Sequence, residues 1–477
     1  MRLKILLSAT LVISYFGCVS AQHTHPPMPG HLENEISAER ILTQIRDFAS
    51  PGFQGREFGE AGNHKAADWI SFTFSNHGLS PLPGEDSFLI SFPVHRLSLS
   101  ENSYLGFDNN SLDIFEEFTA AHYSGDAQFS GETVPVTWGA HHDLTRQDIN
   151  DEIVSVYLSE TSDFKTDHYG IHPAAVWADS LNARGVIFIP HSYSRYLEHT
   201  YRFEPQINLP QDAQKHIGNT AQPFVKEKRL DIPVLVVSNE VLPQDNLNQP
   251  LNVSANISLQ TEQTGLANNV VGYLGEFEPD SPYIVVSAYF DGHGLHPNSG
   301  IPFFGANRNG TGVSVLLELA RSLKTVEDAL EYPVIFAAWN GHERFNAGVK
   351  HFFSSVWKDH ENLMSYLNLS ELSAQQDTSK VEIFGPSEES PFHPHITELT
   401  EKLELGYSYQ PVDPLKNSEF LLPASLSTEI IGLNGGAYTY AGRIHDSPDK
   451  INLRQVYYIS QFSLELLWNL STLYEPL

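Results

Sequence analysis

The chain has 477 residues, with 28 Lys and Arg against 58 Asp and Glu, which gives a formal net charge of −30. Hydrophobic residues make up 41% and charged residues 18%, a balance that is typical of folded globular proteins and excludes a disordered acidic chain. Nucleic acid is not expected as a partner, because phosphate groups are bound by clustered Lys and Arg. The length predicts more than one domain, each large enough for its own core.

The N-terminus has the pattern of a secretory signal peptide. Two basic residues precede an apolar run that is too short to span a bilayer, and small residues lead up to Ala21. We expect cleavage after Ala21, so that residues 1–21 are a signal peptide and residues 22–34 a linker. Lipid attachment at Cys18, the single cysteine, is the alternative. No later stretch is long and apolar enough for a membrane helix, so we expect export to the periplasm or the extracellular space.

Two amphipathic helices are predicted after the linker. Residues Ile36–Phe48 place apolar side chains on one helical face, and Ser37 is a suitable N-cap. The second helix runs from about Asn63 to His77 and ends at Gly78, which favours the left-handed conformation of a helix stop.

Between about residues 98 and 258, the sequence pattern predicts short strands and turns in place of long helices. Strands are predicted at Ile153–Tyr157, Val186–Ile189 and Ile232–Val237, with a helix at Pro173–Asn182. This mixture predicts a compact inserted α+β domain, which we place at residues 96–260.

From Asn269 onward, strands alternate with helices, which is the signature of an α/β sheet. The strands are almost continuously apolar, as expected when helices cover both faces of the sheet. Residues 35–95 and 261–477 are therefore expected to form an α/β domain with a mixed central sheet between layers of helices. The predicted strands are Val270–Leu274, Tyr283–Tyr289, Val334–Trp339 and Tyr366–Leu369, and the last helix runs from about Asn452 to Leu470.

Polar loops are concentrated where such a sheet binds its ligands, just beyond the carboxyl ends of the strands. A single histidine in a loop usually faces solvent, so the prediction of a functional site depends on the cluster as a whole. The loops are residues 288–294, 305–312, 339–343 and 368–371, with a fifth late in the chain at 443–449.

In this order and spacing, the loops resemble those of the secreted co-catalytic zinc exopeptidases of metallopeptidase family twenty-eight, which include bacterial leucyl aminopeptidases. Residues Phe53–Gly59 resemble the family's N-terminal segment, Asn269–Leu274 its entry strand, and Ala174–Ile189 part of a protease-associated domain. The resemblance implies a three-layer zinc-exopeptidase-like fold with an inserted protease-associated domain. It also implies zinc as the cofactor and peptides or proteins as partners, with hydrolysis at the peptide N-terminus.

Most of the metal positions that the resemblance implies are substituted. In the family, one Asp bridges two zinc ions, and that position is Arg308 here. A His ligand is replaced by Tyr289 and an Asp ligand by Ser370. Two zinc-ligand positions are retained, as Glu343 and His445.

Two further positions follow from the same resemblance. His342 stands where the family has its general-base Glu, and Asp291 stands where an Asp orients one of the zinc ligands. A guanidinium stays protonated and cannot bind a metal ion. We therefore expect Arg308 to form a bidentate ion pair with Glu343 or Asp291, and we do not expect a pair of zinc ions to bind.

Two other metal sites are conceivable. His342, Glu343 and His445 form a set of two His and one carboxylate, which suffices for one zinc ion. Glu371 could replace the missing Asp at Ser370, but a shift of one residue along a strand turns the side chain to the opposite face, so we expect Glu371 to point away.

The sequence thus predicts an exported homologue of zinc aminopeptidases that is catalytically degenerate. The alternatives are an active exopeptidase with a mononuclear or shifted zinc site, and a non-catalytic protein that binds peptides or proteins. Substrate preference and oligomeric state cannot be read from the sequence.

Overall fold

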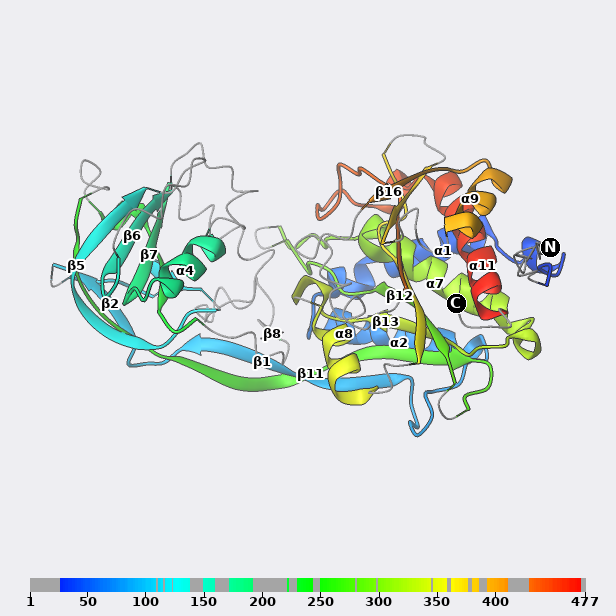
Figure 1. Cartoon of the computed structure of the whole chain (residues 1–477), viewed down its shortest axis with the longest axis horizontal. Helices are drawn as coiled ribbons and strands as arrows, with labels where there is room; N and C mark the ends of the chain where they lie inside the picture. Colours follow the sequence, from blue (N-terminus) through cyan, green and yellow to red (C-terminus); the bar gives the residue numbers. More distant parts are fainter. Residues whose placement is uncertain are drawn as a thin grey trace, which may run out of the picture.

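The computed structural model has two lobes, each built around one β-sheet, and the long strands β1 and β11 connect them (Figure 1). The predicted signal peptide, with Cys18 and the cleavage site at Ala21, lies outside the described residues. Among the helices that are described, none is long and apolar enough to cross a membrane. The structure describes residues 26–108, 110–114, 116–121, 123–137, 149–158, 171–191, 221–222, 230–242, 249–278, 281–296, 299–344, 346–357, 362–375, 380–385, 393–410 and 429–472.

The first lobe contains a mixed sheet of nine strands in the order β16-β15-β17-β14-β12-β13-β11-β1-β8. Strands β13, β12, β14 and β17 are parallel to one another, whereas β11 is antiparallel to β13 and to β1. The strands are β1 Leu89–Leu99, β8 Ala221–Gln222, β11 Leu259–Leu274, β12 Tyr283–Tyr289, β13 Val334–Trp339, β14 Leu363–Leu369, β15 Lys380–Phe384, β16 Gly406–Gln410 and β17 Glu429–Asn434.

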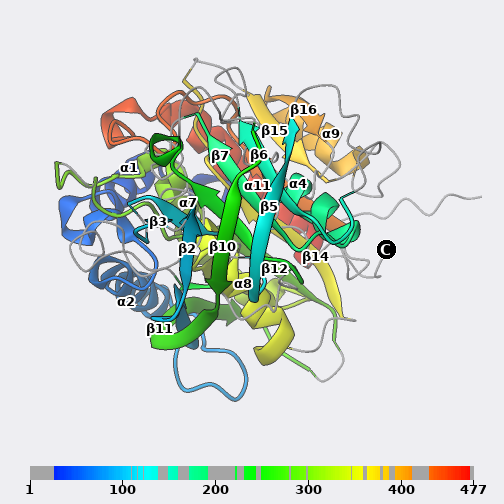
Figure 2. The same cartoon turned by 90° about the vertical axis from the view of Figure 1, so that its left-hand side faces the viewer.

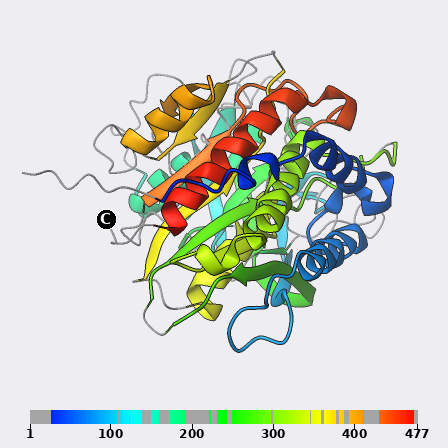
Figure 3. The same ribbon diagram turned by 90° about the vertical axis from the view of Figure 1, so that its right-hand side faces the viewer.

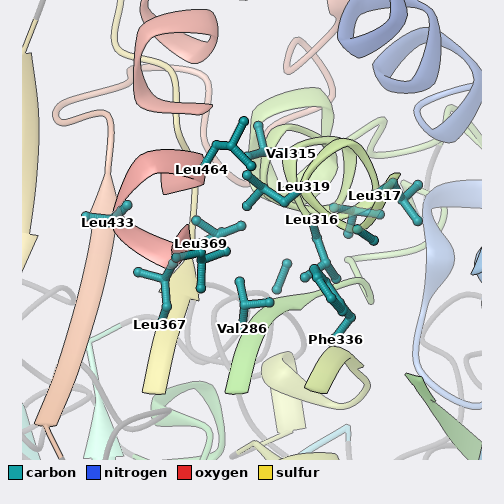
Figure 4. Packing of buried hydrophobic residues seen from close by; sticks show 14 of the residues in the cluster. Val286, Val315, Leu316, Leu317, Leu319, Phe336, Leu367, Leu369, Leu433 and Leu464 are labelled. Carbon is teal, nitrogen blue, oxygen red and sulfur yellow. The ribbon is translucent and has the colours of Figure 1, made fainter. Parts of the chain in front are cut away.

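Helices cover both faces of this sheet. The helices α1 Ala38–Phe48, α2 Ala61–Asn76, α7 Gly312–Lys324, α9 His393–Lys402 and α11 Leu453–Ser471 lie on one side (Figure 3), and α8 Ala347–His351 lies on the other. Because strand residues alternate, Ile284 and Val286 of β12 belong to the core under α7 and α11, whereas Tyr283 and Val285 pack on the α8 side. Figure 4 shows the first of these cores. The predicted three-layer α/β architecture is confirmed.

The two N-terminal helices form as predicted. The Ser37 side chain accepts a hydrogen bond from Arg40 N at 3.3 Å and caps α1. Gly78 has a φ of +77° just after α2, as expected for a helix stop. Two strand predictions were too short: β11 begins at Leu259 because it continues out of the sheet to pair with β1 along its whole length, and β14 begins at Leu363.

The second lobe contains a sheet of eight strands in the order β3-β2-β10-β5-β6-β7-β9-β4 (Figure 2), with helix α4 Ile171–Ser180 packed against β7. Strands and a helix are thus present where the sequence predicted them. The protease-associated identity of this lobe stays a prediction. Its strands are β2 Tyr104–Phe107, β3 Asn110–Ser111, β4 Phe118–Ala120, β5 Ala127–Thr137, β6 Ile153–Leu158, β7 Gly185–Pro190, β9 Val234–Val237 and β10 Asn252–Ile257.

The described part of the expected linker is packed against the first lobe. Leu32 is fully buried in the core, and the indole of Trp468 in α11 donates a hydrogen bond to Pro26 O at 3.0 Å. Further along, the buried carboxylate of Glu318 in α7 accepts hydrogen bonds from Ser37 N at 2.8 Å and from Arg40 Nη2 at 2.7 Å. Residues 26–40 are therefore fixed to α7 and α11, and residues 26–34 do not act as a free linker.

Replacing Glu318 by Gln removes the charge that these donors share. We expect the free energy of unfolding to fall by about 2 kcal/mol, because hydrogen bonds from charged donors lose their ionic acceptor in a buried position. Urea denaturation measures this change. The matched control is Glu398→Gln on the exposed face of α9, for which we expect a change of about 0.5 kcal/mol or less. Equal effects of the two variants would contradict a structural role for the buried carboxylate.

Candidate functional site

The predicted loops meet at one edge of the nine-stranded sheet. Strand β12 ends at Tyr289, which lies beside Trp339, the last residue of the parallel strand β13, and β14 ends nearby at Leu369. Arg308 lies in the turn Ala306–Thr311 that leads into α7. Because parallel strands present their carboxyl ends at the same edge, the residues that follow them converge on one site.

Arg308 is shared between two carboxylates at the centre of this site. Its Nε donates to Glu343 Oε1 at 2.9 Å, and its Nη1 donates to Glu371 Oε1 at 2.7 Å. The side chains of the two glutamates are 5% and 17% exposed, and that of Arg308 is 22% exposed. The expected ion pair with Glu343 is therefore present. The expected bidentate geometry is wrong, because a different carboxylate takes the second nitrogen.

Glu371 reaches the site although the strand pattern predicted that it would point away. Strand β14 ends at Leu369, and Glu371 adopts a φ of +52°, which interrupts the alternation of side chains. Its backbone N–H donates to Asn309 Oδ1 at 2.8 Å, and the Tyr289 hydroxyl donates to its Oε1 at 3.1 Å. A left-handed glutamate has no recognisable signal in a single sequence, so this member of the site could not be predicted.

The charges of the site stabilise one another. Burial alone would raise the pKa of Glu343, but Arg308, together with His293 and His342, holds that pKa well below its usual range. Burial alone would lower the pKa of Arg308, and chiefly Glu343 raises it instead. Burial and the neighbouring Glu371 raise the pKa of Tyr289 well above its usual value, so its phenol stays protonated. At neutral pH the centre of the site is a cation between two anions.

His342, at the position of the family's general base, is a half-buried neutral imidazole. Its ring stacks on Tyr289, with ring centroids 3.7 Å apart and an interplanar angle of 10°. Its Nδ1 lies 2.9 Å from Asn346 Oδ1, an arrangement in which Nδ1 carries the proton. Burial lowers the pKa of His342 to about 4. An imidazole with this pKa is a weak base at neutral pH.

Two buried aspartates bind backbone N–H groups around the site. Asp291 accepts hydrogen bonds from His342 N at 2.9 Å and Glu343 N at 3.0 Å, one on each carboxylate oxygen. Asp446 accepts in the same way from Asn307 N at 2.8 Å and Arg308 N at 3.0 Å. Asp291, predicted to orient a zinc ligand, thus orients the chain that carries Glu343. The equivalent role of Asp446 was not predicted.

The remaining predicted ligands do not join the centre. His445 is exposed, and the backbone N–H of Ser370 donates to Leu433 O at 3.0 Å. Within the described part of the chain, no three or more His, Cys, Asp or Glu side chains are grouped so that they could hold a metal ion. The set of His342, Glu343 and His445 is therefore not assembled. The Arg308 guanidinium stands at the position of the bridging Asp and the protonated Tyr289 phenol at that of a His ligand, so these residues do not fit the two-zinc site that the resemblance implies.

Comparisons with known proteins agree with the fold and the family resemblance. The sequence model of peptidase family M28 matches residues 269–421. No curated protein sequence matches the chain. Among solved structures, an aminopeptidase from Aneurinibacillus sp. strain AM-1 has a TM-score of 0.57 at 14% identity, covering 94% of this chain and 97% of its own.

Two more structures have the same overall fold. The zinc aminopeptidase BSAP from Bacillus subtilis has a TM-score of 0.58 at 15% identity, covering 92% of this chain and 98% of its own. A peptidase M28 precursor from Shewanella amazonensis SB2B has a TM-score of 0.50 at 16% identity, covering 93% and 98% of the two chains. The resemblance stated from the sequence is confirmed, and at these identities the structures establish the fold alone.

Replacing Arg308 by Met should leave two carboxylates facing each other in a largely buried place. We expect the free energy of unfolding at pH 7 to fall by about 3 kcal/mol, because an uncompensated buried charge is costly. The loss should shrink as the pH falls from 7 and should begin to do so above pH 4.5, because without Arg308 burial raises the pKa of Glu343 above its ordinary value of 4.5 and the carboxyl takes up a proton. Urea denaturation at several pH values measures both effects.

The control for this experiment is Arg443→Met, which removes an exposed arginine close to the site. We expect a change of about 0.5 kcal/mol or less and no dependence on pH. A loss for Arg308→Met that stayed constant from pH 7 to pH 4 would show that the ion pairs do not set the charge of Glu343.

The pKa of His342 is a separate test of the site's geometry. We expect its imidazole signals in NMR spectra, assigned by their absence from His342→Gln, to titrate near pH 4. Since the folded pKa lies below the unfolded value of 6.5, the stability contributed by neutral His342 is present above pH 6.5 and is lost as the pH falls toward 4. Titration near 6.5 would mean that the ring does not stack in the buried position.

Proposed function

We propose that this chain, which matches peptidase family M28 over residues 269–421 and has the fold of an aminopeptidase, is an exported homologue of zinc-dependent aminopeptidases that has lost peptide hydrolysis. The observation that supports the loss is the position of Arg308. Its guanidinium lies between Glu343 and Glu371, and so a positively charged side chain of the protein stands where the family has a carboxylate that bridges two metal ions.

The chemistry of hydrolysis explains why this substitution matters. Two-metal sites polarise the substrate and generate a hydroxide from bound water, and a nearby base removes the proton. A guanidinium can donate hydrogen bonds but cannot generate a hydroxide. The residue at the base position, His342, has a pKa of about 4 and is held by Tyr289 and Asn346. The substitutions at Arg308, Tyr289 and Ser370 and the weak base at His342 therefore support the loss of hydrolysis.

The residues of the site favour binding of a peptide or protein over its hydrolysis. The substituted residue Arg308 forms partly buried ion pairs with Glu343 and with Glu371. This organisation supports a protein that binds peptides or proteins at the former active site without cleaving them. We further assign the second lobe, residues 96–260, as a protease-associated domain, and we propose that the predicted signal peptide directs the protein to the periplasm or the extracellular space.

An active enzyme with a single zinc ion is the competing function. It would require exposed His445 to move toward Glu343 and His342 to leave its stack on Tyr289. The ion pair of Glu343 with Arg308 also opposes zinc binding, because a zinc ion would have to displace the guanidinium from the carboxylate.

An aminopeptidase assay on a panel of aminoacyl anilides with added zinc tests the proposal. We expect no hydrolysis above background from the native protein, and no change with a chelator. The matched comparison is a reconstruction that carries Arg308→Asp, Tyr289→His, Ser370→Asp and His342→Glu, which restores the implied ligands and base. We expect the reconstructed variant, and not the native protein, to retain stoichiometric zinc after dialysis.

Hydrolysis by the native protein that a chelator abolishes would overturn the proposal. In that case His342→Ala and His445→Ala identify the site: loss of zinc in both variants would establish a mononuclear centre. Binding without hydrolysis is measured separately, by calorimetry with a peptide library and the native protein.

A further inference from the structure

Arg56 is a fully buried arginine beneath the site. It ends the turn Pro51–Arg56 after α1, and its exposed fraction is 0%. Its guanidinium lies 4.4 Å from the centre of the Phe48 ring. Buried arginines usually pair with carboxylates, whereas the hydrogen bonds of this one go to backbone carbonyl groups.

The carbonyl groups belong to the segments that carry the site. Nε donates to Phe290 O at 3.0 Å, next to Asp291, and Nη1 donates to Phe304 O at 2.9 Å. Nη2 donates to Gly305 O at 3.2 Å and, more weakly, to Arg308 O at 3.5 Å. One side chain therefore joins the loop after β12 to the turn that carries Arg308.

The buried residues Asp291 and Asp446 extend the hydrogen-bonded connection that Arg56 makes between the two segments. Asp446 binds the N–H groups of Asn307 and Arg308. Arg56 binds the carbonyl groups of Gly305, just before the turn, and of Arg308 within it, so the turn is held from both sides. Asp291 binds the N–H groups of His342 and Glu343. We call Asp291, Arg56 and Asp446 the frame. It runs from the backbone of Glu343 to the backbone of Arg308.

We propose that Arg56 is the positioning residue of the site, which sets the Arg308–Glu343 ion pair through the frame. In a two-metal site the ions themselves tie such loops together, because each ion binds side chains from several of them. Here the loops are tied by charge-assisted hydrogen bonds, which the Arg56 guanidinium donates to main-chain carbonyl groups and the two carboxylates accept from main-chain N–H groups. This role does not depend on whether the protein hydrolyses, binds or does neither.

The space around the guanidinium is consistent with this role. A Cβ atom at Gly305 would lie 2.5 Å from Arg56 Nη2, so the turn approaches the guanidinium as closely as only glycine allows. Burial lowers the pKa of Arg56 to about 10, with Asp446 and Asp291 acting in the opposite direction. The guanidinium thus remains charged at neutral pH, and all three members of the frame are fully buried.

The test is Arg56→Lys in protein labelled with 15N-arginine. Lysine keeps the charge but cannot reach carbonyls on several segments at once. The readout is solvent exchange of the Arg308 Nε–H, assigned by its absence from Arg308→Lys. We expect exchange to become about tenfold faster, because the ion pair opens more often. The matched control is Arg321→Lys in α7, a partly buried arginine that pairs with Glu35 and Glu318 outside the site.

A purely structural role predicts a different result. Both lysine variants would then lower the melting temperature, and neither would change the exchange of the Arg308 Nε–H. That outcome, or equal acceleration by both variants, would overturn the proposal. If Arg56→Lys does not fold, Asp446→Asn tests the frame from the other end: unchanged exchange in that folded variant would also contradict it.

Discussion

The site is organised by the need of two neighbouring carboxylates for a positive charge. The side chains of Glu343 and Glu371 are only 5% and 17% exposed, so water solvates their charges poorly, and the attraction between opposite charges grows as the local dielectric constant falls. A metal ion would satisfy this need, and so does the guanidinium of Arg308. A metal ion and the Arg308 guanidinium cannot both occupy this place, because two neighbouring cations repel each other. Once the guanidinium is in place, the surrounding residues follow: Tyr289 donates to Glu371, and His342 stays neutral.

The fold could be predicted largely because its signals are local. Strands β12 and β13 have the predicted bounds, since each is a short apolar run between turn residues. Strand β11 was underestimated, because its first half is polar and is recognisable only through its pairing with β1. The strands β15, β16 and β17, which lie side by side at one end of the sheet, were not predicted either. The family resemblance supplied the order of the loops that periodicity alone could not.

The site was predicted to a smaller extent. Arg308 and Glu343 were paired correctly, because opposite charges at adjoining loop positions leave few other partners. Glu371 was predicted to point away, since strand alternation was extended two residues beyond the strand's actual end. Asp446 and Arg56 were not recognised, because their partners are backbone groups, which leave no complementary residue in the sequence. Positions could be predicted from the resemblance, whereas contacts required the three-dimensional structure.

The pairing of β1 with β11 has a consequence for how the chain reaches this structure. Leu99 lies opposite Leu259, so the polypeptide leaves the first lobe and returns to it at adjacent points, with the second lobe in between. Closing a disordered loop of that length costs about 4–5 kcal/mol of chain entropy. If the second lobe folds early, its own compactness brings the two ends together and removes most of that cost. The paired strands β1 and β11 would then form last. Assembly of the nine-stranded sheet would therefore depend kinetically on the folding of the second lobe, although the ion-pair centre of Arg308, Glu343 and Glu371 lies entirely in the first lobe.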